Sequence, residues 1–522
     1  MMLTKIVLAV SALPLLRAAS PAVEVTELPG LVEPINFRHY SGFLHGAEGR
    51  MLHYWFLESE RSPTEDPVLL WMNGGPGCSS LVGLSMELGP FRIDPSGVNV
   101  TLNPFSWNKV ANVIFLEVPA GVGYSYDPSG SNSSDDFQAT EDNYRAVLEF
   151  FDNFPQFRQN EFYVTGESYA GVFVPLLTQR LLEQPHGINL KGYAIGNGAV
   201  DFEIHGKAIM FFGYYHGLFG DDLWDDVTTH CCNGTVSKET VRFRLVHPRP
   251  NCVDPVNVAY DIILEEGLNL YNLYVPCEIK TLPRELLSRR HPEITSQYAT
   301  KKLLTKTLGL RTSDSDADHN CYNQDNLLLY YNRRDVIEAL HVEQTPHVWV
   351  PCSKVLNFTE EHLTMREVVQ QLQAQSGHLK ALIYHGDVDM ACPFQGGEWF
   401  TRSLGYKSTS LYRMWHVGPL IAGFVENFAN NITFVTVKRA NSVHAFGKSA
   451  HISALRHVSR SRPSVKGYCG GRQNRDVYVD KQRQGCRPHG SDGQTAGITG
   501  DDNQLSYKPD VQMKKKIEKL KW

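Results

Sequence analysis

Short apolar runs separated by polar turns recur along residues 21–201. The runs at 67–72 and 113–118 are nearly continuous in apolar residues, which is typical of strands buried on both faces of a sheet. Apolar residues at helical spacing follow at 142–151, and the run at 190–196 again indicates a strand. This alternation predicts a mostly parallel sheet with helices on both sides.

The alternation stops at residue 202 and resumes near residue 322. The intervening stretch, 202–321, holds five of the ten cysteines and a polar segment at 282–318. We interpret it as a cap insertion, mainly helical and stapled by disulfides, whose polar segment is a loop open to proteases. The core then continues over 322–440, where two further apolar runs, at 379–384 and 432–437, predict strands.

The two ends of the chain differ from this core. Residues 1–20 combine a lysine, a short apolar stretch and small residues, which is the pattern of a secretory signal peptide rather than of a buried helix. Residues 441–522 are rich in Arg, Ser, Gly and Gln and predict an atypical, mostly disordered tail. Beyond the N-terminus no run of apolar residues is long enough to predict a membrane span.

Composition narrows the classes of function and the compartment. With 522 residues, 42% of them hydrophobic, the chain can bury a large core, and its net charge of −6 gives no reason to expect a nucleic-acid partner. Ten cysteines suit an oxidising compartment. Five sequons for N-glycosylation point the same way, at Asn99, Asn132, Asn233, Asn357 and Asn431. We therefore expect the secretory pathway, ending in the lysosome or outside the cell.

The most informative motif is Gly-Glu-Ser-Tyr-Ala-Gly at 166–171. An apolar run at 161–165 precedes it and a helix-compatible stretch at 172–182 follows, which is the layout of a nucleophile elbow. Such a turn lifts the hydroxyl of Ser168 out of the sheet. It also directs the backbone N–H of Tyr169 to the place where an oxyanion forms.

Two further segments supply the partners that such a serine needs. The glycine-rich segment at 71–80 follows a strand, and Gly75 there can supply the second oxyanion donor. The sequence His-Gly-Asp-Val-Asp at 385–389 ends a later strand, and Asp389 lies where the chain order Ser, Asp, His places the acid of a triad. Taken alone, an aspartate at this point would equally well cap the next helix.

Together these motifs resemble the serine carboxypeptidase family of α/β hydrolases. The resemblance rests on W-x-N-G-G-P-G-C-S-S at 71–80, G-E-S-Y-A-G at 166–171, G-N-G at 196–198 and G-D-x-D at 386–389, and it runs from residue 38 to 438. It implies an α/β-hydrolase fold with a mostly parallel central sheet and an inserted, mainly helical, disulfide-stapled cap. It also implies Ser168 as nucleophile and Asp389 as triad acid.

The resemblance further implies a subsite for the C-terminal carboxylate of a substrate, formed by Asn73, Glu87 and Glu167 with Trp71 beside them. A carboxylate binds a pair of glutamates only when the pair carries protons, and crowded carboxyl groups raise one another's pKa. We therefore expect an acidic working range. Without the resemblance, Glu87 would be interpreted as a charge on a solvated helix face.

Other implications concern covalent bonds and partners. The resemblance implies the disulfides Cys78–Cys352, Cys231–Cys252 and Cys277–Cys321, and Cys392 is a thiol near the site to which we assign no catalytic role. We expect no cofactor and no metal. The substrates implied are peptides with a free C-terminus, and a homodimer, glycosidase partners and cleavage within 282–318 follow from the resemblance alone.

The sequence departs from the family where the catalytic histidine belongs. The family places that histidine in G-A-G-H-M-V-P after the last core strand, whereas here Ser442 takes the aligned position and His444 lies two residues later. A frameshift or a mis-predicted exon junction near codon 439 is the explanation we favour. The alternatives are that His444 serves as the base, or that the chain has no base.

The sequence thus predicts a serine-type carboxypeptidase that removes C-terminal residues at acidic pH through an acyl-enzyme. A catalytically impaired binding or protective protein is the first alternative, because the histidine motif is missing. An esterase or acyltransferase on the same scaffold is the second.

Overall fold

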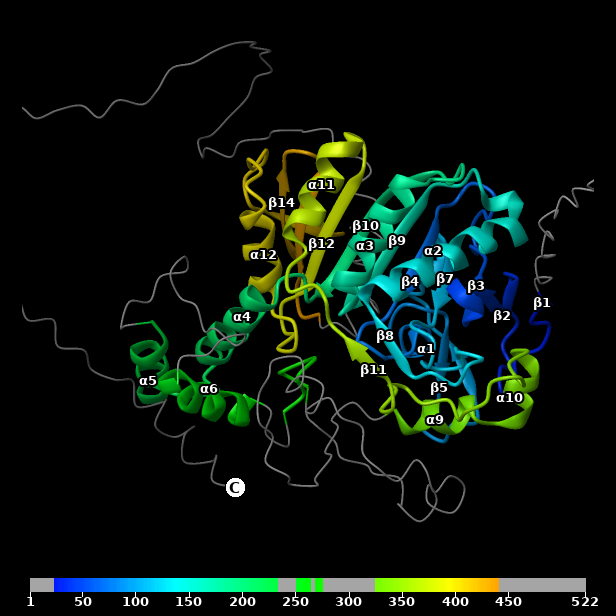
Figure 1. Cartoon of the computed structure of the whole chain (residues 1–522), viewed down its shortest axis with the longest axis horizontal. Helices are drawn as coiled ribbons and strands as arrows, with labels where there is room; N and C mark the ends of the chain where they lie inside the picture. The colour runs from blue at the N-terminus through cyan, green and yellow to red at the C-terminus, as the bar shows by residue number, and fades with distance from the viewer. Residues whose placement is uncertain (1–22, 233–249, 264–267, 276–323, 441–522) are drawn as a thin grey trace, which may run out of the picture. The chain divides into compact units, whose positions relative to one another are not determined.

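The structure is a computed structural model that describes residues 23–232, 250–263, 268–275 and 324–440 (Figure 1). The predicted signal peptide, the loop at 282–318 and the tail at 441–522 lie outside the described residues. An eleven-stranded sheet dominates the described part. Its strands, in spatial order, are β1 (Val23–Glu24), β2 (His39–His45), β3 (Met51–Leu57), β7 (Asn112–Leu116), β4 (Val68–Met72), β9 (Phe162–Ser168), β10 (Leu190–Gly198), β12 (Lys380–Gly386), β15 (Ile432–Val437), β14 (Leu420–Phe428) and β13 (Arg413–Val417).

The centre of the sheet is parallel and its two ends are antiparallel. The six strands from β7 to β15 in spatial order pair in parallel. The strands β1, β2 and β3 at one end, and the hairpin β13–β14 at the other, pair antiparallel. The predicted fold class, a mostly parallel sheet in an α/β protein, is confirmed.

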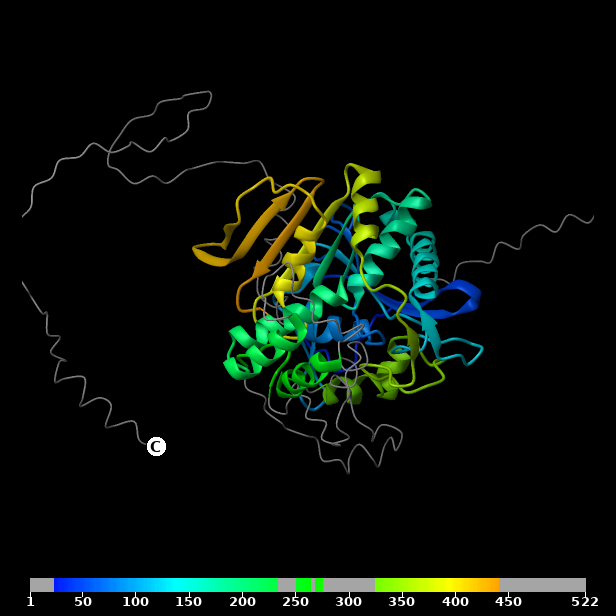
Figure 2. The ribbon, with the colours of Figure 1, turned by 60° about the vertical axis from the view of Figure 1, so that its left-hand side comes forward.

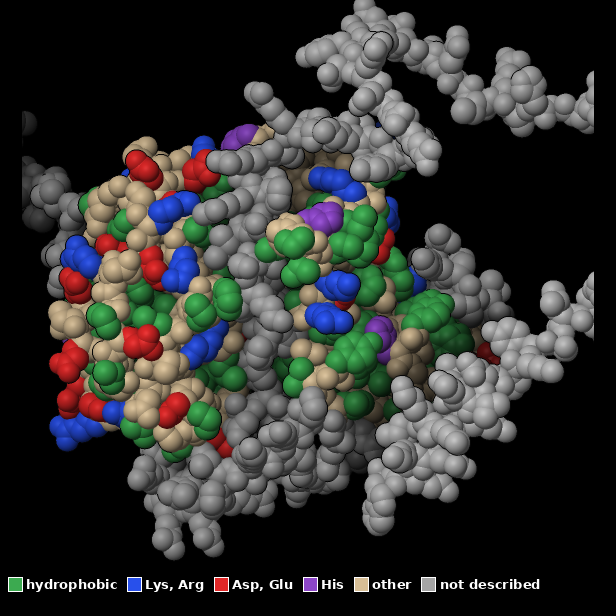
Figure 3. All heavy atoms as spheres, turned by 180° about the vertical axis from the view of Figure 1, so that it is seen from behind, with side chains coloured by type: hydrophobic (Ala, Val, Ile, Leu, Met, Phe, Trp, Pro, Cys, Tyr) green, Lys and Arg blue, Asp and Glu red, His purple; other side chains and the backbone are tan. Residues whose placement is uncertain are grey.

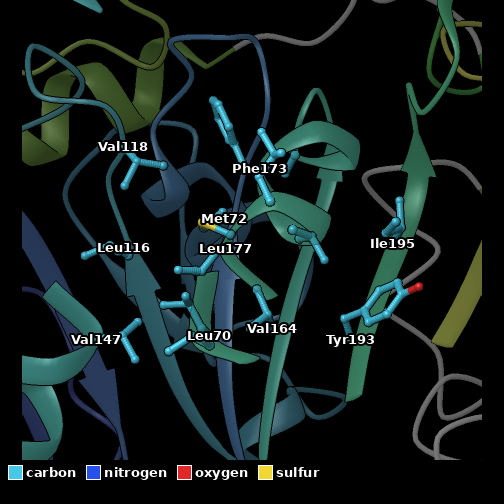
Figure 4. Close-up of a cluster of buried hydrophobic side chains, with 14 of the residues drawn as sticks. Leu70, Met72, Leu116, Val118, Val147, Val164, Phe173, Leu177, Tyr193 and Ile195 are labelled. Atoms are coloured by element: carbon cyan, nitrogen blue, oxygen red, sulfur yellow. The ribbon is translucent and has the colours of Figure 1, made fainter. Parts of the chain in front are cut away.

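One face of the sheet is covered by long helices. The helices α2 (Asp136–Asn153), α3 (Ala170–Glu183), α11 (Arg366–Ser376) and α12 (Phe394–Ser403) contribute apolar side chains to a single core cluster on this face. Figure 4 shows the centre of this cluster, where Phe173 and Leu177 of α3 lie against side chains of the strands. Side chains alternate between the two faces along a strand, so residues two apart, such as Leu70 and Met72 of β4, both point into this cluster.

The other face is covered by shorter elements. Leu69 and Trp71, which alternate with the previous pair along β4, belong to a second core cluster. That cluster includes residues of α1 (Ser80–Val82), the π-helical turn η2 (Gly83–Glu87), α9 (Asp325–Tyr331) and α10 (Arg334–Ala339). Because both faces are buried, the central strands are apolar nearly throughout, as their sequences predict.

Three helices form a separate layer within the predicted cap. They are α4 (Phe202–Tyr215), α5 (Asp221–Cys232) and α6 (Pro250–Ile263), and their apolar side chains make a third cluster. Figures 1 and 2 both show α4 beside α12, and residues of the two helices are in contact. The boundaries that we predict for the cap, 202 and 321, stay a prediction.

Several small elements were not expected from the sequence. They are the strands of the hairpin β13–β14, orange in Figure 2, and two small sheets that pair β5 (Phe91–Ile93) with β6 (Val100–Leu102) and β8 (Ser133–Asp135) with β11 (Asn357–Thr359). On the face shown in Figure 3, acidic and basic side chains are interspersed over the described surface. Within the described residues, no helix has both the length and the apolar character that a membrane crossing requires.

Candidate active site

Ser168 lies at a tight turn between β9 and α3. Its φ of +58° falls in the left-handed region, which is strained for a serine and is a common feature of functional turns. The flanking glycines have no room for a side chain. A β-carbon would lie 2.5 Å from the carbonyl oxygen of Met72 if placed at Gly166, and 2.9 Å from that of Ala199 if placed at Gly171. The backbones of Gly166 and Gly171 therefore pack directly against β4 and the segment after β10, which leaves space only for glycine on either side of Ser168.

The glycine-rich loop that follows β4 lies directly against this turn. A β-carbon on Gly74 would come 2.8 Å from the Cβ of Ser168 and would overlap the backbone nitrogen of Tyr169. The N–H of Gly74 donates to Oε1 of Glu167 at 3.3 Å. Within the described part of the chain, the N–H groups of Gly75 and Tyr169 donate to no acceptor. They are thus available to a ligand beside Ser168.

A buried pair of glutamates lies next to the same loop. The side-chain amide of Asn73 donates to Oε1 of Glu87 and to Oε1 of Glu167, each at 3.0 Å. The indole N–H of Trp71 donates to the amide oxygen of Asn73 at 2.8 Å, which fixes the direction of the amide. Glu87 is only 2% exposed, so a solvated charge on a helix face is the wrong interpretation of this residue.

The environment raises the pKa of both carboxyl groups above the usual range of a glutamate. Burial raises the pKa of Glu167 to about 7, against hydrogen bonds from Gly74 and Asn73 that lower it. Burial, and then the charge of Glu167, raise the pKa of Glu87 well above its ordinary value. Oε2 of Glu87 has no hydrogen-bond partner among the described residues. The pair can therefore offer protons to an anionic ligand.

Asp389 follows β12 and is fully buried. Its Oδ1 accepts a hydrogen bond from the backbone N–H of Cys392 at 3.1 Å, and its charge is close enough to raise the pKa of Glu167. Asp387 is only partly buried and accepts from the N–H of Arg439 at 2.6 Å. Of the two aspartates in this loop, Asp389 is therefore the one that faces the site.

Cys392 lies close to the candidate nucleophile. Burial raises the pKa of its thiol well above the ordinary value, with the charges of Asp389 and Glu167 acting in the same direction and Ser168 acting weakly against them. The thiol therefore stays protonated at neutral and acidic pH. A protonated thiol is a poor nucleophile, so Ser168 stays the candidate nucleophile of this site.

No histidine among the described residues forms a hydrogen bond with Ser168. His385 is nearby, but burial lowers its pKa to about 4 and its Nδ1 lies 3.1 Å from the carbonyl oxygen of Cys392. His444, the histidine that the sequence offers as base, lies outside the described residues.

The remaining predicted site residues are placed as follows. Disulfides join Cys78 to Cys352 and Cys231 to Cys252, the pairs that the resemblance implies, while Cys277 and Cys321 lie outside the described residues. The sequons at Asn99, Asn132, Asn357 and Asn431 have exposed asparagines, and Asn233 lies outside the described residues. In the described ranges no group of His, Cys, Asp and Glu side chains is arranged to hold a metal ion.

Sequence reasoning missed two buried residues near the site. Tyr384 of β12 is close enough to Glu87 and Glu167 that their charges help burial to raise its pKa. Glu117, at the end of β7, accepts a hydrogen bond from Ser79 in the glycine-rich loop. Both lie in runs that the sequence marks only as buried strands, so no local signal separates them from their apolar neighbours.

The family model and the related sequences that match this chain point to one protein family. The family model described as serine carboxypeptidase matches residues 29–460. The chain is 38% identical over 436 residues to the lysosomal protective protein of Mus musculus, covering 81% of this chain and 90% of that protein. It is 32% identical over 462 residues to serine carboxypeptidase 1 of Hordeum vulgare, covering 81% and 89% respectively.

A solved structure shows the same fold. It is that of a prohormone-processing carboxypeptidase from Saccharomyces cerevisiae, which superimposes with a TM-score of 0.63 at 20% identity and covers 84% of this chain and 95% of that one.

Proposed function

The chain belongs to the serine carboxypeptidase family, and from this premise we propose that it removes the C-terminal residue of peptides at acidic pH through an acyl-enzyme on Ser168. The observation that carries the proposal is the protonatable pair Glu87–Glu167, whose two carboxyl groups both accept a hydrogen bond from Asn73. Glu167 directly precedes Ser168 in the sequence, so the pair lies next to the candidate nucleophile. A nucleophile beside a site for a carboxylate selects the last peptide bond of a chain.

The geometry supports a specific sequence of steps. The hydroxyl of Ser168 attacks the last peptide carbonyl while a histidine base takes its proton, and Asp389 orients that histidine and stabilises the resulting imidazolium. In the sequence as it stands, His444 is the candidate for this base. The N–H groups of Gly75 and Tyr169 stabilise the tetrahedral oxyanion. The C–N bond then breaks, the leaving amine takes the proton, and water releases the acyl group from Ser168.

The carboxylate subsite explains the proposed acidic range. At low pH the pair holds protons and donates hydrogen bonds to the terminal carboxylate, with Asn73 and Trp71 holding the pair in place. As pH rises through the pKa of Glu167, about 7, the pair gains charge and repels the carboxylate. Binding of substrate is therefore expected to weaken as pH rises.

Of the two alternatives, one has a specific observation behind it. Because the family histidine motif is missing after Lys438, a catalytically impaired binding or protective protein fits the same scaffold. The likeness to the lysosomal protective protein favours this alternative over an esterase or acyltransferase. We propose the secretory pathway as the compartment, lysosomal or extracellular, and glycosidase partners and a homodimer stay proposals by resemblance.

Hydrolysis of an N-blocked dipeptide at acidic pH by the purified chain tests the proposal, beside a Ser168→Ala variant. We expect turnover of the free acid, little turnover of the same dipeptide as its C-terminal amide, and none with the variant. Equal turnover of both substrates and of a simple ester would favour the esterase. No turnover above the variant, from a folded sample, would favour the impaired binding protein. Sequencing the transcript across codon 439 then separates a real chain from a shifted frame.

A further inference from the structure

A fully buried histidine and glutamate lie behind the glycine-rich loop, outside the site described above. His53 is in β3 and Glu117 follows β7, and each side chain is 0% exposed. Nδ1 of His53 lies 2.8 Å from Oε2 of Glu117, and Nε2 of His53 lies 2.9 Å from the hydroxyl of Ser41. Neither residue has a part in the proposed reaction.

The hydrogen bonds around the pair hold both side chains in place. The hydroxyl of Ser41 lies 2.9 Å from Nε2 of His53 and donates to the carbonyl oxygen of Leu340 at 2.7 Å. The carboxyl group of Glu117 also accepts from the N–H of Tyr124 at 2.9 Å and the indole N–H of Trp349 at 3.0 Å. A buried polar network in which every member has a partner is rigid.

The carboxylate has one more donor, and this donor connects the pair to the active site. The hydroxyl of Ser79 donates to Oε1 of Glu117 and accepts from the N–H of Leu81 at 3.1 Å, where it caps α1. The next residue, Ser80, donates to the carbonyl oxygen of Leu116 at 2.6 Å and accepts from the N–H of Asn73 at 3.0 Å.

Both ends of the turn from Gly74 to Cys78 are therefore fixed to the end of β7. The turn itself is closed by a hydrogen bond from the N–H of Cys78 to the carbonyl oxygen of Gly74 at 3.0 Å. The backbone of Gly123 packs directly against the carboxyl group of Glu117, because a β-carbon at Gly123 would overlap it. The contacts of His53, Tyr124, Trp349 and Gly123 therefore hold Glu117 in place beside Ser79.

We propose that Glu117, held by His53, is a positioning residue that fixes Ser79 and thereby sets the Gly74–Gly75 backbone over Ser168. This inference rests on the proposed function, because it assigns the N–H of Gly75 to the oxyanion. Electrostatic stabilisation by such donors depends on their fixed placement, since a donor that must first reorient loses most of its advantage.

The variant Ser79→Ala removes the hydroxyl that donates to Glu117, and with it the cap on the N–H of Leu81. The matched control for a lost buried hydroxyl is Ser106→Ala, since Ser106 is equally buried and its hydroxyl has no hydrogen-bond partner among the described residues. Glu117→Gln is a second variant, which keeps the cap of Ser79 and so separates the link to Glu117 from the capping of α1. If the change at Glu117 prevents folding, Ser79→Ala still decides whether the hydroxyl of Ser79 positions the loop.

The first measurement is the rate at which a small fluorophosphonate phosphonylates Ser168 in the full chain, a reaction in which the hydroxyl oxygen attacks phosphorus and fluoride leaves. We expect Ser79→Ala to slow it about 10- to 100-fold and Ser106→Ala to leave it unchanged. The second is hydrogen exchange of backbone amides, which we expect Ser79→Ala to accelerate in peptides covering 73–82 and to leave unchanged in peptides covering 162–173. A general structural role would instead accelerate exchange in β3 and β7 as well.

The two measurements separate this inference from the proposed function. A Ser79→Ala variant with wild-type exchange over 73–82 overturns the inference, whether or not the chain reacts with the probe. Phosphonylation of that variant at the wild-type rate overturns it as well. If the wild-type chain itself does not react with the probe, the proposed function fails, and the exchange pattern alone then decides whether Glu117 positions the loop.

Discussion

The backbone of Gly74, in the loop after β4, lies against the side chain of Ser168, at the end of β9. A β-carbon on Gly74 would come 2.8 Å from the Cβ of Ser168. The contact sets the distance between the glycine-rich loop and the nucleophile. It also explains why a residue with no side chain is required at the point where two loops of the site meet.

Gly74→Ala should therefore slow the reaction of Ser168 with a fluorophosphonate probe by about 100- to 1000-fold, the cost of losing one oxyanion donor. The added methyl group would overlap the backbone nitrogen of Tyr169, so the loop must move away and the two proposed oxyanion donors must separate. The measurement is the rate of Ser168 phosphonylation by that probe.

The control for this prediction is Gly220→Ala, because a β-carbon at Gly220 meets nothing within 4 Å. It should react at the wild-type rate. If Gly74→Ala also reacts at that rate, the loop does not supply the oxyanion donors.

Asp389→Asn should lower kcat by roughly three to four orders of magnitude, as expected when a carboxylate that orients a histidine is replaced by an amide. Asp389 is fully buried beside Glu167, and its carboxylate accepts from Cys392. The matched variant Asp387→Asn lies two residues away and binds Arg439 instead, so it should keep most of the activity. A larger loss in Asp387→Asn than in Asp389→Asn would reverse the assignment of the triad acid.

Much of this arrangement is predictable from local sequence. The strands β4, β9, β12 and β15 were predicted because both sheet faces are covered and their residues are apolar throughout. The turn at Ser168 was predicted because its glycines mark a packing contact within a few residues. Both features can be recognised from neighbouring residues in the sequence, without knowing which distant residues they contact.

Other features depend on partners far away in the sequence. Glu117 is 64 residues from His53, so a charged residue at the end of an apolar run gave no indication of a buried hydrogen-bonded pair. The hairpin β13–β14 was missed because large apolar side chains such as Leu420 and Met414 are exposed on it, at 70% and 50%, which removes the usual alternation. Tertiary contacts rather than local pattern determine both features.

Replacing both cysteines of the Cys78–Cys352 disulfide by serine should destabilise the protein more than the same change in Cys231–Cys252. The first bond spans 274 residues and the second 21, and a longer closed loop restricts the unfolded chain more. The difference in the free energy of unfolding is expected to be about 2 kcal/mol. Denaturant unfolding of the two double variants measures it, and equal losses would show that loop length does not govern the effect.

Glu167→Gln should remove a pH dependence that the wild-type protein has. Burial raises the pKa of Glu167 to about 7 from an ordinary value of 4.5, so the folded state holds a proton that the unfolded state has lost. This stabilisation is fully present below about pH 4.5 and is lost as pH rises through about 7. A glutamine stays neutral, so the variant should show a flatter decline in stability over this range.

The same substitution separates binding from folding. In the wild-type enzyme KM for a peptide with a free C-terminus should rise as pH passes about 7, because the ionised pair repels the carboxylate. In Glu167→Gln this rise should be smaller, whereas KM for a neutral ester substrate should depend little on pH in either protein. Glu161→Gln, an exposed change near the start of the same strand, is the control and should behave as wild type. A steep rise in KM that persists in Glu167→Gln would place the controlling group elsewhere, with Glu87 the next residue to change.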